Sequence, residues 1–236
     1  MNELNASVVM ITGASGNVGQ AVAEAFARAG ARLALVDLNA DRLKQVVDSL
    51  PEGAAARPFA TDLSDPQAVD TLLVNIDEAF GKVDHLVHTV GGFAMGDPVH
   101  AGNLDVFDRM MMLNARLVYL LCGRVAAHMI EKKTAGSISV VLARAGKKGG
   151  NTNAAYSASK SAATRIMESM ALELKPHRIR VNGISPSIVD TPPNRDSMPK
   201  ADPAAWVDPA RIAQLALFLA TNDAMTGADV EISAWS

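Results

Sequence analysis

Short runs of aliphatic and β-branched residues alternate along the chain with longer segments in which apolar residues recur every three or four positions. The short runs predict buried strands, at residues 7–11, 32–38, 57–61, 83–90, 137–142, 179–184 and 229–233. The longer segments predict amphipathic helices, at residues 18–29, 40–50, 66–80, 103–133, 154–174 and 210–220. Strands that alternate with helices of this length indicate βαβ units and a parallel sheet covered by helices on both faces.

One stretch interrupts the alternation: residues 186–209 are rich in proline and polar residues and show no clear period. No internal repeat or low-complexity linker divides the chain. Residues 1–236 are therefore expected to form a single doubly wound α/β domain of the Rossmann class. A long irregular segment inside such a domain is typical of a lid or a substrate loop, so residues 186–209 are predicted to border a substrate.

Composition narrows the class of protein further. Only 4% of the 236 residues are aromatic, which is few for a β-sandwich or barrel. The 22 basic and 25 acidic residues give a net charge of −3, which argues against a nucleic-acid partner. The single cysteine, Cys122, excludes an internal disulfide, and the five histidines show no metal-ligand spacing. Without a basic leader or an apolar run of about 18 residues, the chain is expected to be soluble and cytoplasmic, with no membrane partner.

A glycine-rich turn follows the first predicted strand and opens the first helix. Residues 12–19 read TGASGNVG, and Asp37 ends the second strand 18 residues beyond Gly19. Glycines permit a sharp turn and close approach of the backbone, and a helix start presents free N–H groups to a pyrophosphate. An acid at this spacing binds the adenosine ribose and would repel a 2′-phosphate. The pattern predicts a dinucleotide site that prefers NAD(H) to NADP(H); the alternative is an ordinary tight turn with a helix-capping aspartate.

The predicted helix at residues 154–174 carries a candidate acid–base pair. Tyr156 and Lys160 stand four residues apart and share one face. A free tyrosine has a pKa of about 10, and a neighbouring ammonium favours the phenolate and lowers that pKa. The pair is therefore predicted to exchange a proton with an alcohol or carbonyl near neutral pH. The alternative is a surface Tyr and Lys that share a face by chance.

These motifs, in this order, resemble the short-chain dehydrogenase/reductase family over almost the whole chain. The resemblance implies one doubly wound domain with about seven parallel strands, hydride transfer to or from a nicotinamide, and a homodimer or homotetramer paired through the long helices. It implies catalytic roles for Tyr156, Lys160 and Asn114. The cofactor positions that it implies are Gly13, Ser15, Asn17, Val18, Gly19, Asp37, Leu38, Asp62, Leu63, Val90, Gly91, Lys160, Pro186, Val189 and Thr191.

Three positions depart from the family's usual pattern. Asn17 replaces the middle glycine of the turn, and residues 88–91 read HTVG where the family has Asn-Asn-Ala-Gly. The serine that polarises a substrate carbonyl normally stands 13 residues before the tyrosine, and Ala143 occupies that position. A missing donor of this kind can cost about 10²-fold in rate. Either another group supplies the donor, or the substrate does not need it, or the protein is not a carbonyl reductase.

The segment from Asp190 to Trp206 resembles the substrate loop of the dihydropteridine reductase subgroup, which also carries alanine at the position of Ala143. Asn114 departs from that subgroup. This resemblance implies a flat, electron-poor ring, such as a pterin, as the small-molecule substrate. Candidate substrate contacts are Phe93, Ala143, Arg144, Met198 and Trp206. Core packing is the alternative for the apolar ones and a solvated or paired guanidinium for Arg144.

Three functions stay open from the sequence. The first is an NADH-dependent reductase that acts on a pterin-like ring. The second is a carbonyl or alcohol dehydrogenase of another small substrate, with a donor other than serine. The third is a nucleotide-binding regulator without turnover, which the altered glycine turn and Ala143 would suit.

Overall fold

The chain forms one seven-stranded parallel sheet flanked by helices. The computed structural model describes residues 4–236. The strands are β1 (Val8–Thr12), β2 (Arg32–Asp37), β3 (Ala56–Ala60), β4 (His85–His88), β5 (Gly136–Val141), β6 (Ile179–Pro186) and β7 (Asp229–Ile232). Their order across the sheet is β3-β2-β1-β4-β5-β6-β7, and every pair is parallel. The predicted α/β class is confirmed, with strand ends that differ from the predicted ones by a few residues at most.

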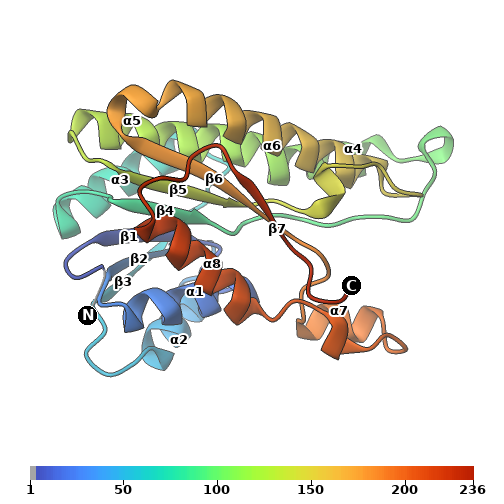
Figure 1. The fold of residues 1–236 in the computed structure, drawn as a ribbon, viewed down its shortest axis with the longest axis horizontal. Coiled ribbons are helices and arrows are strands. Elements are labelled where there is room, and N and C mark those ends of the chain that lie inside the picture. The colour runs from blue at the N-terminus through green and yellow to red at the C-terminus, as the bar shows by residue number, and fades with distance from the viewer. Residues whose placement is uncertain (1–3) are drawn as a thin grey trace.

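Helices cover both faces of the sheet. They are α1 (Asn17–Arg28), α2 (Ala40–Ser49), α3 (Pro66–Phe80), α4 (Leu104–Met111), α5 (Gly123–Glu131), α6 (Ala154–Glu173), α7 (Pro192–Ser197) and α8 (Pro209–Thr221). Figure 1 shows α4, α5 and α6 above the sheet, and α1, α2 and α8 below it. Alternate residues of the central strands enter two separate cores: Met10 of β1 packs on the α6 side, whereas Val9 and Ile11 pack on the α1 side.

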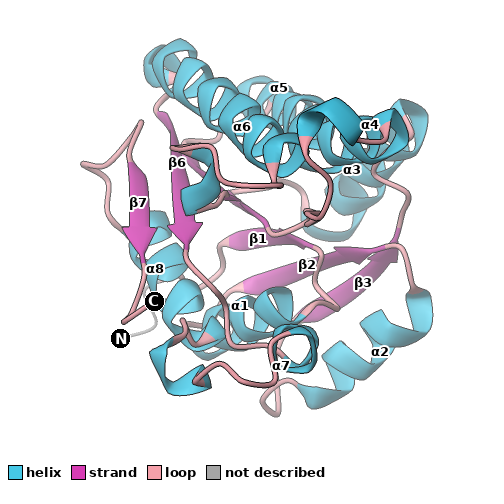
Figure 2. Ribbon diagram, turned by 90° about the vertical axis from the view of Figure 1, so that its right-hand side faces the viewer, coloured by secondary structure: helices cyan, strands magenta, loops and turns pink. Residues whose placement is uncertain are grey.

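Sheet topology creates the place where a ligand can bind. β1 lies between β2 and β4, so the chain leaves β1 toward one half of the sheet and later returns to start the other half. The loops after β1 and β4 therefore separate and leave a crevice outside the carboxyl ends of the strands. Figure 2 shows these strand ends and the neighbouring position of α7.

Residues 186–209 are more ordered than their proline content predicts. They include α7 and a single 3-10 turn at Pro203–Ala205, and the prediction of an irregular loop is wrong for these residues. The two ends of the segment pair with each other: Val189 bridges Val207, and Asp190 N donates to Val207 O at 2.8 Å. Proline at the first positions of α7 supplies a fixed φ that starts a helix without any apolar period.

The helical stretch Leu104–Glu131 contains two π-helical segments between α4 and α5, at Met112–Arg116 and Val118–Cys122. Length and composition alone would let this stretch cross a membrane, but half of its most apolar window is buried inside the protein. Leu117, Val118 and Leu121 belong to the same core as the buried residues of α6. Its apolar character thus follows from packing in the core.

Candidate functional site

The turn after β1 brings two stretches of backbone into contact. Gly13 has φ +69°, and a Cβ on Gly19 would lie 2.1 Å from Gly13 O. Only glycine fits at position 19, because any side chain would push α1 away from the turn. α1 begins at Asn17, and its N-cap residue, Gly16, contributes no side-chain hydrogen bond. The first N–H groups of α1 are thus left for an anionic ligand.

Asp37 lies beside this turn and holds it in place. One carboxylate oxygen accepts hydrogen bonds from Ser15 N at 3.0 Å and Ser15 Oγ at 2.7 Å, and the other accepts from Leu38 N at 2.7 Å. Arg42 of α2 approaches from the other side and donates to Ser15 O at 2.9 Å. The end of β2 and the start of α2 therefore present an anion, Asp37, and a cation, Arg42, to the turn, and sequence reasoning found only the anion.

A cavity of about 590 Å³ runs along the ends of β1, β2 and β4. Most of the predicted cofactor positions line it, namely Gly13, Ser15, Asn17, Val18, Gly19, Asp37, Leu38, Asp62, Leu63, Val90, Gly91 and Thr191. Pro186, Val189 and Lys160 do not. Residues that the sequence did not single out also line it, namely Gly16, Arg42, Thr61, Ser64, Thr89, Met112, Leu113 and Leu117. The helical pattern of the sequence gave no reason to distinguish Met112, Leu113 and Leu117 from core residues.

Lys160, a residue of α6, lies next to the cavity on the side of Gly91. Its side chain is buried and its Nζ donates to Val141 O at 3.0 Å. A Cβ on Gly91, which lines the cavity, would lie 3.2 Å from Lys160 Nζ. Burial lowers the pKa of Lys160 to about 8. Gly91 therefore lies between the cavity and the lysine, and a side chain at this position would contact the ammonium.

Tyr156 precedes Lys160 by one turn of α6, as the spacing requires. Burial raises the pKa of Tyr156 to about 12, and the ammonium of Lys160 does not offset that rise. The predicted lowering of the tyrosine pKa by Lys160 is therefore not found in the protein alone, because Lys160 Nζ is directed to the carbonyl of Val141. Phe93 packs its ring edge-to-face against Tyr156, with centroids 4.9 Å apart. Phe93 is 61% exposed, so it covers the tyrosine from the solvent side.

Asn114 lies within the first π-helical segment, a distortion often found at functional sites. Its amide exchanges two hydrogen bonds with the backbone of Gly92: Oδ1 accepts from Gly92 N at 2.9 Å, and Nδ2 donates to Gly92 O at 3.0 Å. Nδ2 also donates to Ser159 Oγ at 3.0 Å. The buried side chain thus joins the turn after β4 to α6.

His88 occupies the end of β4 at the centre of the sheet. The side chain is fully buried, and its Nδ1 lies 2.8 Å from Thr12 Oγ1 of β1. Its Nε2 has no hydrogen-bond partner among the described residues. Burial, followed by the charge of Lys160, lowers the pKa of His88 to about 3. The imidazole is consequently neutral at physiological pH.

The predicted substrate residues fall into two groups. Phe93 lies against Tyr156, and Ala143 is buried directly before a turn whose Gly146 packs on the backbone of Lys160. The others have different surroundings. Arg144 donates to Ser236 O at 2.6 Å, Met198 is half-buried after α7, and Trp206 is buried and lines neither cavity.

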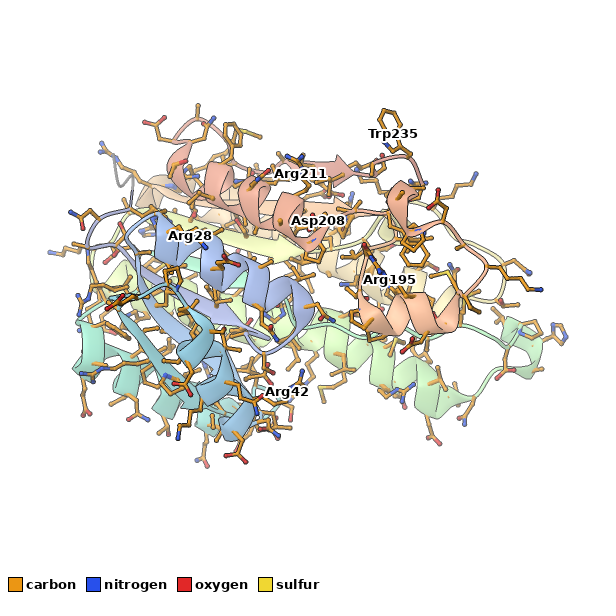
Figure 3. The ribbon with its side chains drawn as sticks, turned by 90° about the horizontal axis from the view of Figure 1, so that it is seen from below. Arg28, Arg42, Arg195, Asp208, Arg211 and Trp235 are labelled. Atoms are coloured by element: carbon orange, nitrogen blue, oxygen red, sulfur yellow. The ribbon has the colours of Figure 1, made fainter. Side chains whose placement is uncertain are left out.

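A second hollow of about 420 Å³ lies beside α7 and shares Thr191 with the first. Arg195 spans it by donating from Nε and Nη2 to the two carboxylate oxygens of Asp190, at 2.6 and 2.7 Å. Figure 3 shows Arg195 on α7 and, on α2, Arg42. No group of three or more potential metal ligands occurs in residues 4–236.

Comparison with known proteins places this geometry in a family. The model of the short chain dehydrogenase family matches residues 7–202. The chain is 32% identical to D-threitol dehydrogenase of Mycolicibacterium smegmatis over 241 residues, which cover 97% of this chain and 92% of that protein. It is also 32% identical to galactitol 2-dehydrogenase of Agrobacterium fabrum over 187 residues, 79% of this chain and 72% of that one. The crystal structure of an NAD⁺-bound xylitol dehydrogenase superposes with a TM-score of 0.90 at 28% identity, covering 98% and 99% of the two chains. The chain therefore belongs to the short-chain dehydrogenase family of oxidoreductases.

Proposed function

We propose that the protein is an NAD(H)-dependent oxidoreductase in which Tyr156 gives a proton to, or takes one from, a small substrate. The observation that carries the proposal is the position of Gly91, which lines the 590 Å³ cavity and lies next to Lys160 Nζ. A bound dinucleotide would occupy the cavity, with its pyrophosphate at the start of α1 and its adenosine ribose at Asp37. The glycine pair at positions 13 and 19 fits such a ligand, because a side chain at Gly19 would close the turn.

When bound, the nicotinamide supplies or accepts the hydride. The protein's own residues handle the proton. In the reductive direction the substrate gains a hydride and one proton, and Tyr156 is the only phenol near the end of the cavity that can donate it. With a pKa of about 12, the Tyr156 hydroxyl is protonated at neutral pH and is ready to act as an acid. The protein alone therefore holds Tyr156 in the protonated form that the reductive direction requires.

The substrate class follows from what surrounds the tyrosine. Ala143 is buried and offers no hydroxyl to polarise a ketone oxygen. Phe93 presents an exposed aromatic edge beside Tyr156. An apolar wall without an oxygen-directed donor suits a flat ring with a reducible C=N bond, such as a pterin-like ring, better than a simple ketone.

A second candidate substrate class comes from the relatives. Three of them are dehydrogenases of sugar alcohols by name: D-threitol, galactitol and xylitol dehydrogenases. A polyol carries neighbouring hydroxyls, which side chains such as Asn151 or Asn153 could bind in place of the missing serine. This alternative requires oxidation of an alcohol by NAD⁺ and release of the proton through Tyr156.

One experiment separates the two classes. Purified protein is assayed by nicotinamide absorbance with NADH and a quinonoid dihydropterin, and with NAD⁺ and four- to six-carbon polyols. Tyr156→Phe removes the proton donor, and Tyr119→Phe, an exposed tyrosine of the long helix, is the matched control. We expect the Tyr156 variant to lose at least about 10²-fold in turnover while NADH still binds. A Tyr156→Phe protein with full activity would overturn the proposal, as would tight NADH binding without hydride transfer to any compound of the panel.

Cofactor choice has its own test. Asp37 places a carboxylate where the 2′-phosphate of NADP(H) would lie, so NADH is expected to bind more tightly than NADPH. Asp37→Asn removes the repulsion and leaves Arg42, which lines the same cavity. This variant is expected to gain affinity for NADPH, and Asp37→Asn combined with Arg42→Ala is expected to lose that gain. Wild-type protein that binds NADPH more tightly would contradict the role given to Asp37.

A further inference from the structure

His88 is a buried polar side chain to which the proposed mechanism gives no task. It follows Leu86 by two residues, so the two side chains lie on the same face of β4. Leu86 belongs to the core that includes Ala163 and Met167 of α6. The imidazole of His88 therefore lies on the α6 side of the sheet.

Three observations bring His88 close to Lys160. His88 pairs in register with Val140 of β5, and Lys160 Nζ binds the carbonyl of the next residue, Val141. Gly91, three residues after His88, approaches Lys160 so closely that a Cβ would lie 3.2 Å from Nζ. The charge of Lys160 also shifts the pKa of His88, and it is the only charged group that does so.

The hydrogen bonds of the two residues are complementary. If Nδ1 of His88 donates its proton to Thr12 Oγ1, then Nε2 carries a lone pair. That Nε2 is buried and has no partner among residues 4–236. An ammonium has three N–H donors, and Lys160 Nζ donates one of them to Val141 O. Asn114 Oδ1 accepts from Gly92 N and makes no hydrogen bond with Lys160 in the structure.

We infer that His88 is a positioning residue for Lys160: its neutral imidazole, held by Thr12, supplies a buried acceptor that Lys160 Nζ reaches through one water molecule. The inference rests on the proposed function, in which Lys160 supports Tyr156 and the nicotinamide ribose. It gives a task to the histidine that replaces the first asparagine of the family's pattern. Buried polar groups of this kind retain their hydrogen bonds because leaving them unpaired is costly.

The first test uses variants of His88 and a matched control. His88→Leu removes the acceptor and His88→Gln restores one, because an amide oxygen can accept at a similar distance. His85→Leu is the control: His85 is also a buried imidazole of β4, but it binds Ser137 Oγ at 2.9 Å, and Lys160 is not among the groups that shift its pKa. We expect His88→Leu to lower turnover about tenfold or more, His88→Gln to recover most of it, and His85→Leu to keep wild-type turnover per folded molecule.

The pH profile gives a readout that mere loss of stability would not move. The titratable groups facing Lys160 are His88 from β4 and Tyr156 from its own helix, and no carboxylate shifts the pKa of Lys160. Loss of the acceptor makes the ammonium less stable, so the alkaline limb of kcat/KM moves to lower pH in His88→Leu. An unshifted profile in His88→Leu, or an equal shift in His85→Leu, would overturn the inference.

A measurement without turnover separates this inference from the proposed function. Nitrogen NMR of protein labelled with ¹⁵N-histidine reports which ring nitrogen of His88 carries the proton, with His88→Gln used for assignment. The inference requires a protonated Nδ1 and an unprotonated Nε2 at pH 7. A protonated Nε2 would overturn it, even if Tyr156→Phe proves inactive as expected. If Tyr156→Phe keeps full activity while Nε2 is unprotonated, the proposed function fails and the assignment of His88 as a buried acceptor stands.

Discussion

Two buried histidines should make the protein sensitive to acid well above the pH at which carboxylates are protonated. His85 and His88 both belong to β4, and both side chains are buried. Burial lowers the pKa of His85 to about 4 and that of His88 to about 3. Both are neutral in the folded protein at pH 5, whereas both are protonated in the unfolded chain, in which a histidine has a pKa of about 6.5.

The sign of the effect follows from proton uptake on unfolding. Above pH 6.5 neither state binds these protons, so the free energy of unfolding is unaffected. Below pH 6.5 the unfolded chain binds one more proton per histidine, and stability falls by about 1.4 kcal/mol per pH unit and per histidine until the folded pKa is reached. At pH 5 the loss is about 2 kcal/mol for each histidine and about 4 kcal/mol for both. That is a large part of the 5–15 kcal/mol of a typical domain.

Urea unfolding at pH 7.5 and pH 5, followed by circular dichroism at one protein concentration, measures this difference. His85→Asn keeps a polar group opposite Ser137 but does not titrate. We expect the variant to be less stable at pH 7.5 and to lose about 2 kcal/mol less than wild type between the two pH values. The half-buried His128 shifts in the same direction and is common to both proteins. Equal losses in variant and wild type, or a wild-type loss under 1 kcal/mol, would refute the reasoning.

Three further predictions follow from single contacts. Gly19→Ala places a Cβ 2.1 Å from Gly13 O, so we expect calorimetry to show loss of NADH binding and a cost in stability of about 1–3 kcal/mol. Gly123→Ala is the matched case in which no atom lies within 4 Å of the new Cβ; it should stabilise the helix by about 0.5–1 kcal/mol in urea unfolding. Phe93→Ala uncovers Tyr156 and should raise KM for the small substrate that exchanges hydride with the nicotinamide. The Tm should stay nearly constant because the ring is 61% exposed.

The sequence predicted those parts of the molecule whose causes are local. β1 and β2 are runs of aliphatic residues, which predict buried strands. The glycines at positions 13 and 19 predict the turn between β1 and α1, because its backbone geometry leaves no room for a side chain. Tyr156 and Lys160 were found because a spacing of four residues fixes a shared helix face. These features required no knowledge of the rest of the chain.

What the sequence missed depends on contacts between distant segments. Arg42 reaches the turn only because α2 packs on β2 and β3, beside the end of β1, and its hydrogen bond to Ser15 O spans 27 residues. α7 has no apolar stripe and forms where two prolines follow a strand end. The pKa of Tyr156 depends on where the lysine points, and the carbonyl that attracts Lys160 comes from β5.

Two departures from the family's pattern lie on either side of the same lysine. His88 ends β4 on one side of Lys160. Ala143 follows β5 on the other side, next to a turn whose Gly146 would place a Cβ 3.0 Å from the backbone of Lys160. β4 and β5 are neighbouring strands, and Lys160 lies near the ends of both. A substitution at either strand end therefore changes the surroundings of the Lys160 side chain. Restoring serine at position 143 alone would bury a new hydroxyl beside a lysine that already donates to Val141 O, and unpaired buried hydroxyls are costly. The two positions are therefore best exchanged together when the chemistry of this site is tested.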